Sequence, residues 1–197
     1  MKQIEISKID KYSKEVLHKQ LKNHSIVLVG MMGVGKTTIG KLLAKLLEIP
    51  FKDSDKEIEM ISRFSVAEIF QKYGEEEFRR IENLVIQRLL KEKPIILSIG
   101  GGAFINPIIR NHITKNAISI CLEADKNILL QRIALRPTRP LLNAENPTLI
   151  FETLLQQRNP IYQTADIRIN TNSQNTKIIT ETLLIKLQQY ITKINLG

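Results

Sequence analysis

The stretch GMMGVGKTT, residues 30–38, decides the fold of this 197-residue chain. It has the spacing G-x-x-x-x-G-K-[ST] of a phosphate-binding loop, in which glycines bring backbone N–H groups close to phosphate oxygens. An apolar run at residues 26–29 precedes it, and residues 37–47 follow with the spacing of an amphipathic helix. That helix would direct the positive end of its dipole at the bound anion. The stretch therefore predicts a buried strand, a phosphate loop and a helix, in that order.

The loop also predicts which residues hold the phosphates of ATP. Lys36 would place its charge beside the β- and γ-phosphates, and the Thr37 hydroxyl would complete the coordination shell of one Mg²⁺ ion. The motif does not separate a small-molecule kinase from a motor, a GTPase or a transporter ATPase, but the long apolar strand ending in Asp-Glu of a motor does not follow in the sequence. The residues of the loop expected to bind ATP are Gly33, Val34, Gly35, Lys36, Thr37 and Thr38.

Strand-like and helix-like segments alternate along the rest of the chain. Ser65 and Glu68 predict the start of a helix with a capping box, and Gly74 predicts its end. The alternation is typical of an α/β fold with a doubly wound five-stranded parallel sheet and helices on both faces, whose ligands lie at the carboxyl ends of the strands. The other predicted strands end near residue 52 and span residues 95–99, 117–122 and 166–169; the other predicted helices span residues 76–90, 125–135, 148–158 and 176–191.

The composition limits the classes of protein that the chain can represent. Its hydrophobic fraction of 43% supports a core, but no uncharged apolar run reaches the about 18 residues that span a bilayer, so we expect no membrane partner. The net charge of +9 is spread along the chain and aromatic residues make up only 5%, so stacking platforms are few and we expect no nucleic-acid partner. The single cysteine, Cys121, cannot form an internal disulfide, which indicates a reducing cytoplasm.

Two acidic residues in the segment FKDSDKE, Asp53 and Asp55, end the predicted second strand. On an extended chain their side chains point to the same side. One carboxylate could orient the waters of Mg²⁺ while the other accepts a hydrogen bond from an attacking hydroxyl. The alternative is that this segment simply caps the next helix, because Asp and Ser are preferred there. The position next to the phosphate loop favours the functional interpretation.

Further polar residues predict where an acceptor binds. Arg79 and Glu82 lie three apart on one helix face, which fits either a solvated ion pair or a substrate site. The glycine triplet at residues 100–102 follows a strand at its carboxyl end, where a backbone can approach a ligand. Arg158, in the segment QQRNPIY, could bind a carboxylate with two N–H groups.

A second group of arginines follows the helix predicted at residues 125–135. The segment RPTRPLL, residues 136–142, contains two prolines and begins four residues after Arg132. An arginine on a mobile loop could stabilise charge on the transferred phosphoryl group and help to exclude water. A basic surface loop is the alternative. The favoured interpretation is a lid at about residues 132–145.

Six motifs together carry a family resemblance. The segments GMMGVGKTT, DSD, FRRIE, SIGGGA, RPLL and RNPIY resemble the shikimate kinase family of P-loop proteins, and they occur in the family's order over residues 25–190. The resemblance implies an ATP-dependent small-molecule kinase that transfers the γ-phosphoryl group to the 3-hydroxyl of shikimate, in the pathway to chorismate and the aromatic amino acids. It implies ATP and shikimate as partners, with one Mg²⁺ ion, and we expect a monomer.

The resemblance also implies roles on the nucleotide side. Lys36 and Thr37 would serve the phosphates and Mg²⁺. Asp53 would reach the metal through water. Arg139, in RPLL, would come down as the lid arginine between acceptor and phosphate, and Arg132 would lie near the adenine.

On the acceptor side, the resemblance assigns the hydroxyl to Asp55, which would hold and polarise it. Arg79 and Arg158 would bind the carboxylate of shikimate, and Glu82 would orient Arg79. The backbone that lines the ring would come from Gly100, Gly101 and Gly102. The catalytic residues are expected to be Lys36, Asp55 and Arg139.

The expected organisation is one P-loop kinase domain, residues 25–197, preceded by a helical extension at residues 1–24 that the compact family pattern lacks. The segment TNSQN, residues 171–175, also departs from the family, because it offers no arginine to the adenine. The apolar residues that can share one face of the extension are Ile9, Tyr12, Val16, Leu17 and Leu21.

Two other functions stay open at this point. A gluconate-type sugar-acid kinase of the same fold would also need arginines for a carboxylate, although the glycine triplet and RPLL favour shikimate. From a different class, the chain could be a nucleotide-dependent module that binds nucleic acid through its positive charge.

Overall fold

The sheet places the phosphate loop at the centre of the molecule. The computed structural model describes residues 17, 19–21, 24–135, 146–173 and 175–195. Within them, five parallel strands form one sheet in the order β2-β3-β1-β4-β5, so the loop after β1 has two strands on either side. The predicted five-stranded parallel sheet is therefore confirmed. The strands are β1 (Ser25–Val29), β2 (Phe51–Asp53), β3 (Ile96–Ser98), β4 (Ala117–Glu123) and β5 (Ile167–Asn170).

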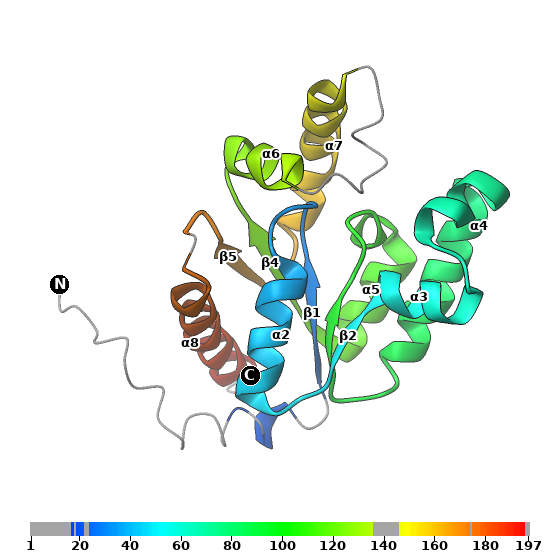
Figure 1. Cartoon of the computed structure of the whole chain (residues 1–197). Coiled ribbons are helices and arrows are strands. Elements are labelled where there is room, and N and C mark those ends of the chain that lie inside the picture. Colours follow the sequence, from blue (N-terminus) through cyan, green and yellow to red (C-terminus); the bar gives the residue numbers. More distant parts are fainter. Residues whose placement is uncertain (1–16, 18, 22–23, 136–145, 174, 196–197) are drawn as a thin grey trace.

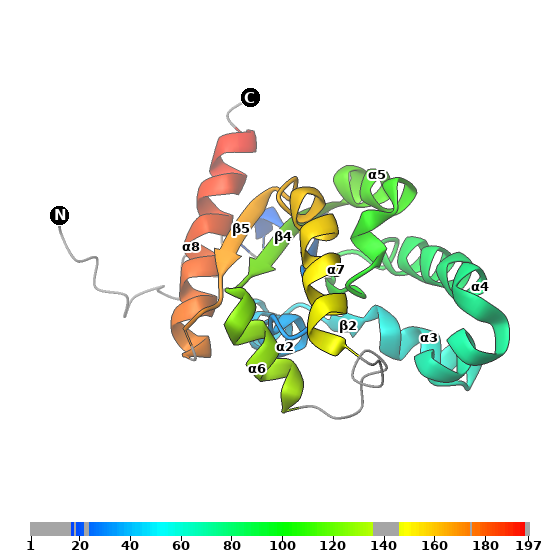
Figure 2. The same cartoon turned by 90° about the horizontal axis from the view of Figure 1, so that it is seen from above.

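Helices cover both faces of this sheet, as predicted (Figure 1). The helices are α2 (Lys36–Leu47), α3 (Ser54–Ser62), α4 (Val66–Leu89), α5 (Pro107–Asn116), α6 (Lys126–Ala134), α7 (Pro147–Tyr162) and α8 (Thr176–Asn195), with a 3₁₀ turn, η1, at Ala103–Ile105. On one face α2 and α8 pack against each other, and on the other α5 packs against β4. Seen from above, α6 and α7 lie together near the middle of the view, and α3 and α4 lie apart from them on the right (Figure 2).

Local signals in the sequence set the ends of α4. The Ser65 hydroxyl accepts a hydrogen bond from the N–H of Glu68 at 3.2 Å, and the Glu68 carboxylate accepts one from the N–H of Ser65 at 2.7 Å. This is the predicted capping box. Gly74 has φ 81° and ψ 173°, a conformation that favours glycine, and it interrupts the helix at the predicted position. The segments on either side of Gly74 therefore run in different directions within α4.

The core is formed by the sheet and by the inner faces of the helices. All five residues of β1 are buried, as expected for a central parallel strand that is covered on both faces. Cys121, in β4, is also buried, and burial raises the pKa of its thiol to about 12, so the thiol stays protonated at neutral pH. Among the described residues, no helix is both long and apolar enough to cross a membrane.

Part of the N-terminal extension contributes to this core. Leu17 and Leu21 are buried, with exposed fractions of 1% and 0%. The other three residues of the predicted apolar face, Ile9, Tyr12 and Val16, lie outside the described residues. A helical extension over residues 1–24 thus stays a prediction.

The predicted elements do not include α3 or α5. At the start of α5, the Asn106 side chain accepts a hydrogen bond from the N–H of Ile108 at 2.8 Å, and Pro107 occupies the first turn. Asn at the N-cap and Pro in the first turn are both signals for the start of a helix that can be read from the sequence. Helix α3 begins directly after β2 without an intervening loop.

Candidate active site

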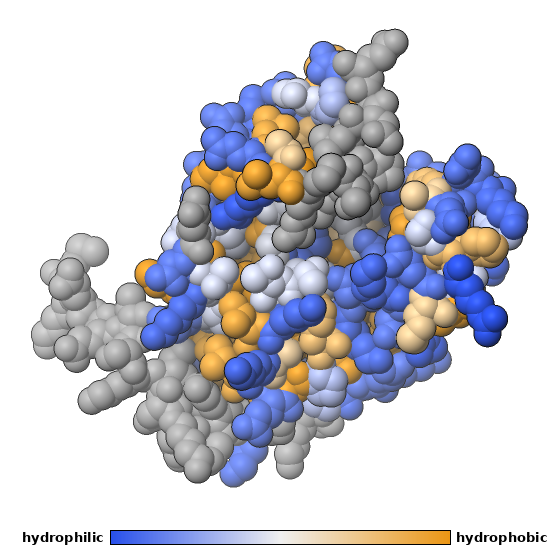
Figure 3. Space-filling model, in the orientation of Figure 1, coloured by the Kyte–Doolittle hydropathy of each residue, from blue (hydrophilic) through white to orange (hydrophobic). Residues whose placement is uncertain are grey.

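One cavity of about 1240 Å³ lies at the carboxyl ends of the strands and collects the predicted site residues. The surface falls away between the lobe of α6 and α7 and the lobe of α3 and α4 (Figure 3). Arg139 and most of the predicted lid lie outside the described residues. All other predicted site residues line the cavity: Gly33, Val34, Gly35, Lys36, Thr37, Thr38, Asp53, Asp55, Arg79, Glu82, Gly100, Gly101, Gly102, Arg132 and Arg158.

The phosphate loop is held in shape by backbone geometry. Gly30 has φ 129°, and an added Cβ there would stand 2.3 Å from the carbonyl oxygen of Leu122, so no other residue fits. The Lys36 ammonium donates hydrogen bonds to the carbonyl oxygens of Gly30 at 2.7 Å and Met31 at 3.1 Å. These bonds hold the lysine over the loop. Since Lys36 is also the first residue of α2, the charge and the helix N-terminus point at the same place.

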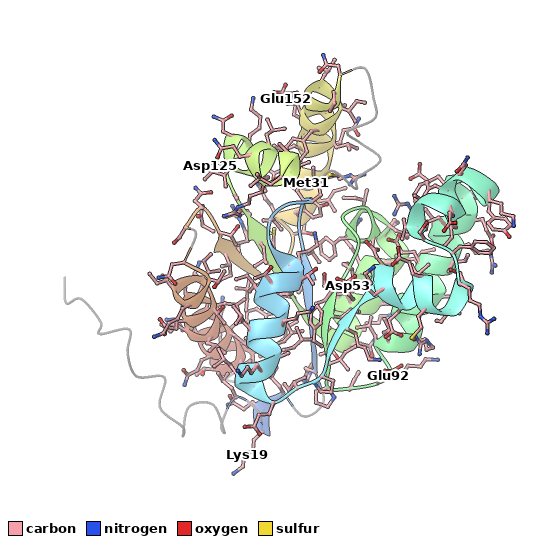
Figure 4. All side chains as sticks on the ribbon, in the orientation of Figure 1. Lys19, Met31, Asp53, Glu92, Asp125 and Glu152 are labelled. Atoms are coloured by element: carbon pink, nitrogen blue, oxygen red, sulfur yellow. The ribbon has the colours of Figure 1, made fainter. Side chains whose placement is uncertain are left out.

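A hydroxyl and a carboxylate stand where the sequence predicts the metal. The Thr37 hydroxyl donates a hydrogen bond to Asp53 Oδ2 at 3.0 Å. Asp53 lies where β2 passes into α3, and Met31 marks the loop after β1 (Figure 4). Mg²⁺ prefers such oxygen ligands and is held by one or two carboxylates together with substrate phosphates and water. Among the described residues, no group of three or more His, Cys, Asp or Glu could hold a metal alone. The hydroxyl of Thr37 and the carboxylate of Asp53 fit a metal that is also held by substrate phosphates and water.

Asp55 reaches the cavity by a different route from the one predicted. It does not extend the strand, because β2 ends at Asp53 and Asp55 lies in the first turn of α3. The Asp53 carboxylate accepts a hydrogen bond from the N–H of Asp55 at 3.2 Å and so caps the helix. The extended-chain geometry is thus wrong, and the capping alternative is present. Yet both carboxylates line the cavity, so the helix cap and the site are built from the same residues.

The surroundings of Asp55 favour proton uptake. Burial raises the pKa of its carboxyl, the neighbouring negative charge of Asp53 raises it further, and the positive charge of Lys36 lowers it. Asp55 and Lys36 line the same cavity. A carboxylate with a raised pKa beside the expected γ-phosphate is placed to accept a proton from an alcohol.

The acceptor side is centred on Arg79. Its Nη1 donates a hydrogen bond to Glu82 Oε2 at 2.7 Å, and Glu82 is fully buried, which excludes the solvated ion pair considered above. Burial raises the pKa of Glu82 to about 6, although the charge of Arg79 lowers it. Glu82 Oε1 makes no hydrogen bond within the described part of the chain. An added Cβ at Gly100 would stand 2.8 Å from this oxygen and 2.9 Å from Asp55 Oδ1.

The glycine triplet makes room for the two arginines. At Gly102, an added Cβ would stand 2.5 Å from Arg79 Nη2, and at Gly101 the nearest atoms are Arg158 Nη1 and the hydroxyl of Tyr162, both at 3.6 Å. Two guanidinium groups, one from α4 and one from α7, therefore lie over adjacent glycines. Such a pair can bind one carboxylate from two sides.

Arg132 lies on the opposite wall, toward β5. Its Nη2 donates a hydrogen bond to the carbonyl oxygen of Thr171 at 2.7 Å. The Thr171 hydroxyl in turn donates to the carbonyl oxygen of Val34 at 3.1 Å. Arg132 is thus tied to the segment after β5 and, through it, to the phosphate loop. This segment lacks an arginine of its own, and the expected contact between Arg132 and adenine stays a prediction.

Comparisons with known proteins agree with this geometry. The model of the shikimate kinase family matches residues 32–188. A shikimate kinase of Bartonella henselae is 45% identical over 190 residues, which cover 96% of this chain and 89% of that protein. The chain belongs to the shikimate kinase family. A second shikimate kinase, from Brucella suis biovar 1, is 41% identical over 179 residues, covering 91% of this chain and 90% of the relative.

Solved structures of shikimate kinases have the same fold as this chain. The shikimate kinase from Acinetobacter baumannii in complex with shikimate is 36% identical, with a TM-score of 0.80, and the match covers 91% of this chain and 99% of that one. A gluconokinase from Sinorhizobium meliloti matches with a TM-score of 0.58 at 14% identity, over 89% of this chain and 97% of that one. At that identity the gluconokinase shares the fold alone.

The comparison with the Bartonella relative also bears on the N-terminal extension. An alignment of 190 residues in a chain of 197 must include most of residues 1–24. This shikimate kinase therefore carries an equivalent of most of that segment, whereas the matched part of the family model begins at residue 32.

Tyr162 contacts two residues of the site, and the sequence reasoning did not single it out. Its hydroxyl donates a hydrogen bond to the carbonyl oxygen of Gly101, and it lies beside Arg158. Burial raises the pKa of Tyr162 to about 12, while the charge of Arg158 lowers it. Tyr162 ends the RNPIY motif four residues after Arg158, one helical turn away. That spacing could have indicated a shared position on α7.

Proposed function

We propose that this member of the shikimate kinase family transfers the γ-phosphoryl group of ATP to the 3-hydroxyl of shikimate, a step toward chorismate and the aromatic amino acids. One observation carries the proposal: the phosphate loop, Asp55 and two arginines line the same cavity. A loop for phosphates, a carboxylate for a hydroxyl and arginines for a carboxylate are the three parts that this transfer needs.

On the nucleotide side, the chain binds and orients the triphosphate. The backbone of the loop donates N–H groups to the phosphates, and Lys36 adds a positive charge at the β- and γ-phosphates. Thr37 and Asp53 would hold one Mg²⁺ ion, Asp53 through water. The bound metal neutralises charge that develops on the transferred group.

On the acceptor side, Asp55 accepts the proton of the attacking 3-hydroxyl. Its pKa, raised by burial and by Asp53, suits this role, because the proton moves to a group that tolerates the neutral form. Arg79 and Arg158 bind the shikimate carboxylate and so fix the ring. Glu82 acts as a positioning residue for Arg79, with the hydrogen bond of 2.7 Å described above.

The rest of the proposal concerns the lid and the state of the enzyme. Arg139 would approach the transferred group when the lid closes, and Arg132 would lie near the adenine. We expect a monomeric, cytoplasmic enzyme that needs no nucleic acid. Light scattering of the purified chain measures the mass of its assembly directly.

A panel of acceptors tests the proposed reaction. ADP release from ATP and Mg²⁺ should rise sharply with shikimate, stay low with gluconate and not respond to added RNA or DNA. A larger response to gluconate than to shikimate would replace the proposal by a sugar-acid kinase. A response to nucleic acid alone would replace it by a nucleotide-dependent binding module.

A further inference from the structure

Arg79 holds a second carboxylate besides that of Glu82. Glu75 Oε1 accepts hydrogen bonds from Arg79 Nε at 3.2 Å and from Arg79 Nη2 at 3.0 Å. These two N–H groups form one edge of the guanidinium plane, the edge that binds a carboxylate with two hydrogen bonds. Glu75 thus has the position that a bound anionic ligand would take.

The other sides of the same guanidinium group are occupied too. Nη1 is bound to Glu82, which is fully buried. The ring of Phe78 lies against the group, with its centroid 5.2 Å from Arg79 Cζ. Gly102 lies so close that an added Cβ would stand 2.5 Å from Nη2. The edge occupied by Glu75 is therefore where an incoming carboxylate can form two hydrogen bonds with Arg79.

We propose that Glu75 competes with the carboxylate of the acceptor for Arg79 and thereby sets the affinity for the acceptor. The proposal rests on the proposed function and deepens it. Glu75 lines the same cavity as Arg79 and Arg158. When the acceptor binds, its carboxylate replaces that of Glu75 at the Nε and Nη2 edge, while Glu82 keeps Nη1.

The two carboxylates on Arg79 differ in how easily they can leave. The side chain of Glu75 is 66% exposed, so water can solvate its charge when the ion pair opens. The side chain of Glu82 is 0% exposed, and a charge left there without a partner would be costly. Glu75 also follows Gly74 directly, and an added Cβ at Gly74 would meet no atom within 4 Å. The backbone directly before Glu75 therefore has open space beside it.

This arrangement favours acceptors that carry a carboxylate. A neutral acceptor gains nothing from Arg79 that could offset the loss of the Glu75 ion pair. A carboxylate exchanges one ion pair for another and adds the contact with Arg158. Competition by an exposed ion pair is weak, on the order of a two- to fivefold effect on affinity.

The substitution Glu75→Gln tests the proposal. We expect it to lower the dissociation constant of shikimate, measured by calorimetry without ATP, by about two- to fivefold, with a similar fall in KM and little change in kcat. If Glu75 merely held Arg79 in place, the same substitution would weaken binding instead. The sign of the change separates the two roles.

The control is Glu77→Gln, which removes the same charge from the same helix. Glu77 forms its ion pair with Arg80, with an Nη2–Oε1 distance of 2.7 Å, and is absent from the cavity lining. Its substitution should leave the affinity for shikimate unchanged. If Glu77→Gln raised the affinity as much as Glu75→Gln does, the loss of one negative charge would explain both results, and the proposal would be overturned. Equal or weaker binding of shikimate by the Glu75→Gln variant would overturn this proposal and leave the proposed function intact. If the unchanged chain did not bind shikimate, the proposed function would fall and this proposal with it.

Discussion

The nucleotide side and the acceptor side of the cavity are built in different ways. The nucleotide side is mostly backbone: a glycine loop between β1 and α2, with a helix N-terminus and one lysine. The acceptor side is mostly side chains: Arg79 with two carboxylates, and Arg158 with Tyr162. A backbone site keeps its shape through glycine geometry, whereas a side-chain site keeps its shape through burial and ion pairs.

The two sides of the cavity select their ligands in different ways. Any triphosphate can bind to the backbone and charge of the loop, so that half of the cavity selects a class of ligand. The acceptor half selects one geometry of charge, because its guanidinium groups are fixed over two adjacent glycines. Substitutions on the acceptor side should therefore change acceptor affinity and leave the nucleotide untouched.

Asp55 lies where the two sides meet, and its loss should have the largest effect. We expect Asp55→Asn to lower kcat by a factor of about 10² to 10⁴, the usual contribution of a general base. Affinity for ATP should stay near its normal value, because the loop and Lys36 are unchanged. The coupled assay for ADP release gives kcat, and calorimetry gives the affinity for ATP. A kcat near that of the unchanged enzyme would remove Asp55 from catalysis.

Arg158→Ala should sharpen the comparison by acting on the acceptor side only. We expect KM for shikimate to rise about thirtyfold or more, because removal of one partner of a charged, hydrogen-bonded pair costs about 2–5 kcal/mol. KM for ATP should change little. If the substitution weakened ATP binding and left shikimate binding intact, the carboxylate site would lie elsewhere.

Two glycines of the triplet offer a matched pair of substitutions. At Gly102, a methyl group would stand 2.5 Å from Arg79 Nη2, whereas at Gly101 its nearest neighbours lie 3.6 Å away. Gly102→Ala should displace Arg79 and raise KM for shikimate by about tenfold, since small misplacements of positioning groups are costly. Gly101→Ala should change KM much less. Equal effects of the two substitutions would contradict the assigned place of Arg79.

The pH dependence of acceptor binding should show the smallest effect. Glu82 has a pKa of about 6, raised chiefly by burial. Below that pH its carboxylate takes up a proton and loses the charge that orients Arg79, so KM for shikimate should rise about fourfold between pH 7 and pH 5.5. Glu82→Gln should raise KM at both pH values and remove this dependence. An unchanged pH profile in that variant would assign the titration to another group.

The same raised pKa affects stability with the opposite sign. In the unfolded chain Glu82 titrates near its ordinary value of 4.5, and in the folded chain near 6. The folded state therefore binds this proton more tightly, and the stability that the proton contributes is lost as the pH rises from about 4.5 through 6. Binding of shikimate needs ionised Glu82. The site therefore works at a pH at which the buried charge of Glu82 lowers the free energy of unfolding.

The contrast between the two sides also explains what the sequence could predict. The loop at residues 30–38 was predictable because its geometry depends on glycine spacing and on the strand and helix beside it, all of which are local. The capping box of Ser65 and Glu68 and the helix break at Gly74 are local for the same reason. Strands β1, β3 and β4 followed from apolar runs, whereas β2 has only three half-buried residues and β5 alternates between buried and exposed ones.

Features that depend on contacts between distant residues could not be predicted in this way. Burial of Glu82 depends on α3, α4 and the glycine triplet coming together, so sequence spacing could not separate a buried pair from a solvated one. The place of Asp55 was predicted for the wrong reason, because the helix cap by Asp53 was treated as an alternative to the site. Tyr162 was not singled out, because its hydrogen bond goes to Gly101, far away in the sequence. Glu75 lies four residues before Arg79 on the same helix, so its ion pair could have been predicted from the spacing.

The central claim is that the phosphate loop and the acceptor site face one cavity and exchange a phosphoryl group directly. Phosphorus-31 NMR of the products from ATP, Mg²⁺ and shikimate tests this most directly. The account predicts one phosphate monoester, at the 3-hydroxyl of shikimate, for each ADP formed. ADP with inorganic phosphate and unchanged shikimate would contradict it.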